Sequence, residues 1–563
     1  MRNNFRYSLL AIIILGFSLN SCSFLEIDDE NMSTRDLAFI NPGNVEAMCF
    51  NVYSYIPGSF SEIGGNSTLS NACDEADLNN RYSSVQDFNN GTWGIFSNPD
   101  DKFSTLYAGI RAANHFLEGS QNLDYAEYKD SDPVRYQFYT TRLKDYKTEV
   151  RFLRAFFYFE LIKRYGGVPI ITKVINLGDE VDLTRNTYGE CFKFIASELN
   201  AILPNSRTIA ETGFMGRVTK GTIYALKTRL YLYAASPLNN NGTYNLALCD
   251  SSARAFVALS KLGLYDLNID YRGLFLNQTA TNKEIIFDRR LPMDNFMESS
   301  NYPLGGAAQY AYNVGANATC PSQNLVDAYE MADGSKFDWN NPVHAATPFK
   351  NRDPRFGMSI LSNGDTWNEK TVESFVDGID GLGKNNATTT GYYLKKFVNE
   401  KLVLRDNRTA SHVFHIFRYG EMMLCFAEAM NEVLGPDGKY ADFTLSARDA
   451  LNQIRNRTGV KMPAITGSNS KEEFREKVRN ERRVELAFEN HRFWDVRRWM
   501  IADVTENAPL RGMKITKNQD NSFSYAPNYL VEERVFKAPA MYRYPISNNE
   551  IVKYQNLKQT ENW

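Results

Sequence analysis

Apolar side chains recur at intervals of three and four residues through long parts of the chain, the spacing of one face of an α-helix. Residues 143–165 show this most clearly, with apolar positions repeating from Tyr146 to Leu161. Gly166, Gly167 and Pro169 follow directly and indicate where that helix ends. The same spacing predicts helices over residues 106–117, 188–203, 218–235 and 244–262.

Short connections containing Pro or Gly join these predicted helices, which favours helical hairpins stacked as in tetratricopeptide repeats. The repeats must be degenerate, because no regular period of about 34 residues is present. We therefore predict a mainly α fold of degenerate tetratricopeptide-like hairpins. Residues 43–264 form its helical-repeat scaffold and also carry N-terminal binding loops.

The pattern changes between residues 265 and 410, where Asn, Gly, Asp and Thr become frequent. Short strands are predicted at residues 284–287 and 392–397, so this region is a loop-rich insertion and a candidate ligand face. In the last region, residues 411–563, helical spacing returns at 414–433, 445–457 and 471–500 before an irregular tail.

The N-terminus has the pattern of a secretory signal. Arg2 and Arg6 precede an apolar run over residues 9–19, which is shorter than the roughly 20 residues a membrane-spanning helix needs. The run ends in Leu-Asn-Ser-Cys, which resembles a bacterial lipobox, although Asn20 departs from it. We expect a signal peptide over residues 1–21, a lipidated Cys22 and an acidic tether over residues 22–42. An ordinary signal peptide ending near a cysteine is the alternative.

Composition excludes some functions. Hydrophobic residues make up 43% of the chain and charged residues 23%, as in a globular protein, and a net charge of −3 gives no basic field for nucleic acid. No cofactor is predicted, because the chain has no dinucleotide fingerprint, P-loop, G-x-S-x-G or H-E-x-x-H motif.

No metal site is predicted either. The six cysteines after Cys22 lack zinc-ligand spacing and are expected to be mostly buried thiols. His412 and His415 are three residues apart but have no carboxylate nearby to complete a metal site. The stretch from Asp74 to Asp77 lacks the ligand repeat of a calcium loop.

Several motifs occur in the order found in one protein family. They are PSQNLVDAYEM at 321–331, NRDPRF at 351–356, GYYLKKF at 391–397, RYGE at 418–421 with AEA at 427–429, RNERRVELAFENHRFWDVRRW at 479–499, and YPI at 544–546 with EI at 550–551 and NL at 556–557. Together they resemble the SusD/RagB family over nearly the whole mature chain. Charges in the 479–499 motif fall three and four residues apart, and we expect them to pair along a helix in a structural role.

Resemblance to this family implies a non-catalytic protein anchored by lipid in the outer membrane and exposed at the cell surface. Such a protein covers a SusC-like TonB-dependent transporter and holds a glycan, or alternatively an oligopeptide, over the transporter's mouth. An extracellular glycoside hydrolase and a pure protein–protein scaffold are the less favoured readings of the same chain.

Ligand contacts are expected on loops that combine aromatic rings with hydrogen-bonding side chains. In the polar stretch before residue 106, the candidates are Trp93, Arg81, Tyr82 and Asn98. In the loop-rich region they are Tyr302, Trp339 and Trp367. The sequence does not distinguish rings that bind ligand from rings that anchor the transporter interface.

Overall fold

The protein is mainly helical, as predicted. A computed structural model describes residues 39–563 except 62, 64–66, 177, 180–182, 210–215, 277–281 and 308–313. The predicted signal peptide, Cys22 and most of the predicted tether lie outside the described residues. Within the described part of the chain, no helix combines the length and apolarity needed to cross a membrane.

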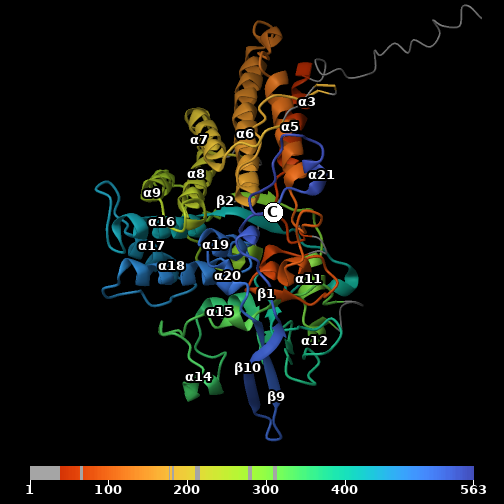
Figure 1. The fold of residues 1–563 in the computed structure, drawn as a ribbon, viewed down its shortest axis with the longest axis vertical. Helices are drawn as coiled ribbons and strands as arrows, with labels where there is room; N and C mark the ends of the chain where they lie inside the picture. Colours follow the sequence, from red (N-terminus) through yellow and green to blue (C-terminus); the bar gives the residue numbers. More distant parts are fainter. Residues whose placement is uncertain are drawn as a thin grey trace, which may run out of the picture.

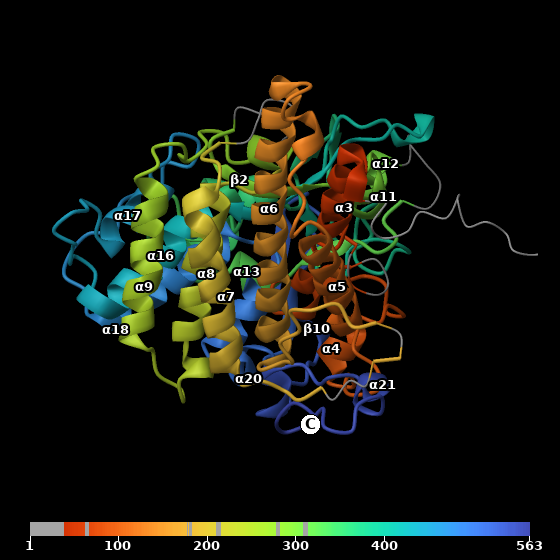
Figure 2. The same ribbon diagram turned by 90° about the horizontal axis from the view of Figure 1, so that it is seen from above.

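Successive long helices pack against one another as hairpins (Figures 1 and 2). Helix α5 packs on α6 and α6 on α7, while α8 packs on α9 and α9 on α16, which also contacts α17 and α18. Their bounds are α3 Pro42–Ser54, α5 Phe103–Gly119, α6 Pro133–Tyr165, α7 Tyr188–Ile202, α8 Lys220–Ala235, α9 Leu246–Ser260, α16 Tyr419–Leu434, α17 Ala447–Arg455 and α18 Lys471–Glu485.

Side chains at the helix ends fix several of these boundaries. Thr187 caps α7 in a reciprocal pair with Glu190, and Ser470 caps α18 in the same way with Glu473. Helix α6 ends at Gly166, whose φ of 77° lies in the region that glycine adopts without strain. These local signals explain why the predicted C-terminal end of α6 was right.

Helix α6 begins ten residues earlier than predicted, at Pro133 instead of residue 143, and Asp132 caps its first turn. Leu143 is its first buried residue. The first turns extend beyond the neighbouring helices (Figure 1). Val134 and Phe138 are exposed there, and Tyr136 and Tyr139 are only partly buried against the core, so the regular apolar spacing that predicted the helix is missing.

Two predicted helices are wrong in part. Strand β8, Val413–Arg418, precedes α16 and pairs antiparallel with β2, Ile285–Arg290, so the first residues of the 414–433 prediction are a strand. The single helix predicted over 471–500 is two, α18 and α19, Arg492–Arg498. Phe488 and Asn490 adopt φ values of 65° and 63° between them, which no α-helix accommodates.

The loop-rich region encloses a second hydrophobic cluster, separate from that of the helical hairpins. Short antiparallel pairs border it: β1, Ala76–Leu78, with β3, Thr319–Pro321; β4, Ile360–Leu361, with β7, Tyr393–Leu394; and β9, Leu510–Lys517, with β10, Phe523–Glu532. The β9–β10 hairpin projects at the opposite end of the molecule from the tip of α6 (Figure 1).

Charged residues of the 479–499 motif are buried, and most pair with distant segments rather than along their own helix. Glu485 accepts hydrogen bonds from Arg355, 2.9 Å away, and from Arg418, also 2.9 Å away. Arg492 donates to Asp74 over 2.8 Å. The prediction of pairing along the helix holds for Arg498 with Asp495 but is wrong for these contacts, because the helix is surrounded by other elements.

The six described cysteines are all buried and free, as the sequence predicts. A buried thiol packs as a small hydrophobic group, and that of Cys425 also accepts a contact of 3.4 Å from Nη1 of Arg482.

Candidate functional site

Three segments far apart in the sequence form an open groove of about 840 Å³. One side is the turn after β1, and the others are the loops around residues 316–317 and 382–389, with β10 at the edge. We name it the amide groove after its lining residues, which are Asn79, Asn80, Arg81, Tyr82, Ala316, Asn317, Leu382, Gly383, Lys384, Asn385, Asn386, Ala387, Thr388, Thr389, Tyr529 and Val531.

Asparagine side chains hold the three segments together. Asn79 donates through Nδ2 to the carbonyl oxygens of Gly315, 2.7 Å away, and of Ala387, 3.2 Å away. Its Oδ1 accepts a hydrogen bond of 2.8 Å from the backbone N–H of Ala318. Asn80 donates to Oδ1 of Asn317 over 2.7 Å. Pairing of β1 with β3 places these residues opposite one another, so the groove's walls are fixed before any ligand arrives.

Two tyrosines border the groove with exposed rings. Tyr82, in the turn after β1, is 99% exposed, and Tyr529, on β10, is 37% exposed. The ring of Tyr82 stays in water and is fully available to a ligand, whereas Tyr529 is partly covered and keeps only part of its surface available. One predicted residue, Tyr82, therefore lines the same groove as Tyr529, which the sequence did not single out.

Arg81, which the sequence singled out as a candidate ligand residue, lines the amide groove, and two carboxylates orient it. Its guanidinium pairs with Asp77, with Nη2 2.8 Å from Oδ2, and Nη1 donates to Glu532 over 2.8 Å. Thr389 donates to the same oxygen, Oδ2 of Asp77. Burial, with a contribution from the negative charge of Glu532, raises the pKa of Asp77 to about 6.

Three predicted aromatic residues are not at the surface, and the prediction that they contact ligand is corrected. Trp93 is 3% exposed and packs against Phe88, Tyr544 and Trp563, with ring centres about 5 Å apart. Tyr302 and Trp367 are fully buried in the second cluster, with ring centres 5.4 Å apart. Apolar neighbours cover these rings, so none presents a face to a ligand.

Trp339 and Asn98 also lie outside the amide groove. The half-buried Trp339 donates through Nε1 to Asp327 over 3.0 Å, and its ring lies 4.9 Å from Phe337. The half-buried Asn98 accepts a hydrogen bond of 3.0 Å from the backbone of Asp100, which is a turn contact. The structure separates both from Arg81 and Tyr82.

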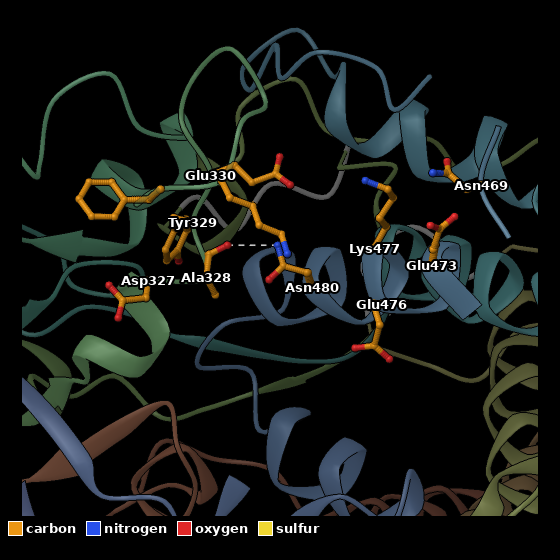
Figure 3. A pocket seen from close by; sticks show the side chains of 11 residues that line it. Asp327, Ala328, Tyr329, Glu330, Asn469, Glu473, Glu476, Lys477 and Asn480 are labelled. Atoms are coloured by element: carbon orange, nitrogen blue, oxygen red, sulfur yellow. Dashed lines mark hydrogen bonds between the residues drawn. The ribbon is translucent and has the colours of Figure 1, made fainter. Parts of the chain in front are cut away.

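A second groove, of about 640 Å³, lies between the loop after residue 326 and α18 (Figure 3). Its carboxylates are engaged: Asp327 pairs with Arg511 over 3.0 Å and Glu330 with Arg455 over 2.8 Å. Two rings line it: Tyr329 is fully buried, and Phe337 is covered by the guanidinium of Arg352 and by the imidazole of His344. Without a free aromatic face, this groove is the weaker candidate for a ligand.

The histidine pair does not form a site. His412 contacts Glu298, with Nε2 3.1 Å from Oε1, whereas Nε2 of His415 lies 3.1 Å from the carbonyl oxygen of Leu274. Asp74 is paired with Arg483 and Arg492. Among the described residues, no three His, Cys, Asp or Glu side chains are arranged to hold a metal ion.

Comparison with family models identifies both parts of the chain. The model of the SusD family matches residues 283–563. A second model, described as starch-binding and associating with the outer membrane, matches residues 24–232. The amide groove takes residues from both matched parts.

Individual relatives agree with the family models. A SusD-like protein of Formosa agariphila is 22% identical over 97% of this chain and 98% of its own length, and another is 24% identical over 65% and 69%. A solved SusD-like protein of Bacteroides fragilis superposes with a TM-score of 0.76 at 26% identity, covering 93% of this chain and 98% of that one.

Two further solved structures share the fold. A SusD-like carbohydrate-binding protein of Bacteroides fragilis has a TM-score of 0.73 at 22% identity, over 92% of this chain and 100% of that one. A laminarin-binding SusD-like protein has a TM-score of 0.59 at 20% identity, over 92% and 99%.

Proposed function

Because this chain belongs to the SusD family, we propose that it captures a glycan in the amide groove and delivers it, unmodified, to a SusC-like TonB-dependent transporter. Lipid on Cys22 would anchor it in the outer membrane, with the described part exposed at the cell surface. The family model that matches residues 24–232, described as associating with the outer membrane, supports this location.

The pair of exposed tyrosines beside the amide groove carries the proposal. Sugar rings have flat C–H faces that stack on aromatic rings, and Tyr82 and Tyr529 offer two such faces at one groove. The amides between them can donate to and accept from sugar hydroxyls. Each contact is modest, so a polymer that engages several sites binds more tightly than a single sugar unit.

Binding is favoured over hydrolysis by the lining of the groove. Glycosidases act with two carboxyl groups that flank the scissile bond. None of the described residues lining the amide groove is Asp or Glu. Asp77, below the surface, is already shared between Arg81 and Thr389.

Affinity electrophoresis of the chain from residue 23 onward, through gels containing single polysaccharides, tests this function. We expect retardation by at least one glycan, and Tyr82→Ala should reduce the affinity about two- to tenfold, as loss of one stacking ring costs roughly 0.5–1.5 kcal/mol. Phe96→Ala is the matched control, because Phe96 is 84% exposed but lies outside both grooves.

Released sugar products would contradict capture without reaction. If no glycan retards the protein, the alternative ligand is an oligopeptide, whose backbone the same asparagine amides could bond. Loss of binding in Phe96→Ala as well as in Tyr82→Ala would show that the assay reports general surface adhesion instead of the groove.

A further inference from the structure

Both charged residues that line the amide groove, among those described, are positive. Resting on the proposed function, we infer that the groove selects an acidic glycan, one that carries carboxylate or sulfate groups, and that Lys384 determines this preference. Arg81 and Lys384 are the charged residues among the described lining residues, none of which is Asp or Glu.

Arg81 contributes no net charge, because its neighbours cancel it. It pairs with Asp77 and Glu532, and Glu532 in turn accepts a 2.6 Å hydrogen bond from the buried Arg534. Two guanidinium groups and two carboxylates therefore form one neutral cluster. The charge left over in the groove is that of Lys384.

Lys384 is exposed, and its ammonium makes no ion pair with any described residue. Its backbone is nevertheless held in place. The carbonyl oxygen of Lys384 accepts a 3.2 Å hydrogen bond from the N–H of Ala387, whose own carbonyl accepts from Asn79. Gly383 turns the chain with a φ of 85°. A fixed backbone thus carries a flexible cation at the edge of the groove.

The unused hydrogen-bonding groups point to the same ligand class. Asn317 uses its Oδ1 for Asn80, which leaves its Nδ2 as a donor. The Nε–H of Arg81 and the side chain of Asn385 form no hydrogen bond with the described residues. Carboxylate and sulfate groups accept hydrogen bonds and carry negative charge, so they match donors grouped around an uncompensated cation.

Affinity electrophoresis with matched glycans tests the inference. Polygalacturonate and dextran sulfate serve as acidic polymers, and laminarin and amylose as neutral ones. We expect an acidic polymer to bind more tightly, and Lys384→Gln to weaken that binding about three- to tenfold, as for a partly exposed ion pair. The same binding should weaken between 50 and 300 mM salt, since salt screens exposed charges.

Lys336→Gln is the control, because Lys336 is also exposed and unpaired but lines the second groove. Equal weakening by both lysine variants would mean general attraction to the polymer and would overturn the inference. Binding of a neutral glycan that depends on Tyr82, without binding of either acidic polymer, would overturn it while leaving the proposed function intact. Retardation by none of the four polymers would count against the proposed function itself.

Discussion

At the scale of single residues, Tyr82 and Trp93 show how differently two aromatic rings of one polar stretch are used. Tyr82 follows β1 in a turn that reaches into solvent, and no described side chain covers its ring. Trp93 is enclosed by Phe88 and by Tyr544 and Trp563 from the far end of the chain. The first ring is free to bind, and the second stabilises the fold.

Replacement of Trp93 should accordingly affect stability and not binding. Trp93→Phe removes part of a buried ring system, and we expect it to lower the free energy of unfolding by about 1–3 kcal/mol. Chemical denaturation followed by fluorescence measures this loss. The folded variant should bind glycan with the affinity of the wild type. A loss of affinity without a loss of stability would show that Trp93 belongs to the binding site.

At the scale of elements, buried ion pairs join α18 to the strand and loops around it. Glu485, at the end of α18, contacts Arg355 from the loop-rich region and Arg418 from β8. Burial raises the pKa of Glu485, but the guanidinium groups of Arg457, Arg418 and Arg355 outweigh this effect and lower the pKa to about 2. The carboxylate is thus ionised at neutral pH and offsets several buried cations.

Glu485→Gln should therefore destabilise the whole molecule. Removing one buried partner leaves guanidinium groups uncompensated, and we expect a loss of about 3–5 kcal/mol in the free energy of unfolding at pH 7. Because the folded-state pKa is depressed, the stabilisation is present above the unfolded value of about 4.5 and is lost as pH falls toward 2. The difference between wild type and variant, measured by denaturation, should shrink in that range.

Glu476→Gln provides the comparison, because Glu476 is exposed on the same helix and pairs with Arg479 one turn away. Its effect should stay within about 0.5 kcal/mol. Equal stability losses in the two variants would contradict the structural role of the buried network.

At the scale of the whole molecule, the amide groove depends on segments from both ends of the chain. The turn after β1 lies in the part matched by the starch-binding model, whereas Lys384 and Tyr529 lie in the part matched by the SusD model. Neither part contains the groove alone. Because Cys22 precedes the described residues, the proposed capture and the proposed membrane attachment can be tested separately.

Cys22→Ser in the full chain should release the protein from membranes and leave its glycan affinity unchanged. In the proposed function the lipid on Cys22 would supply the anchor, whereas the described residues form the groove. Fractionation of cells, together with electrophoresis of the released protein, measures both properties. Retention of Cys22→Ser on membranes at the wild-type level, in cells that lack the transporter, would contradict lipidation at this residue. The transporter is removed because it could by itself hold the protein at the membrane.

The sequence by itself determined the helical hairpins, most of their ends and the family, because these follow from local spacing, caps and ordered motifs. It also singled out Arg81 and Tyr82, which lie in one short turn and both line the amide groove, whereas their contact with ligand stays a prediction. Only the tertiary structure decided that Trp93, Tyr302 and Trp367 are buried, that β8 replaces the first turn of a helix, and that Tyr529 and Lys384 join the groove. Burial and groove formation depend on which distant segments of the chain pack together. The local spacing of apolar residues carries no information about those long-range contacts.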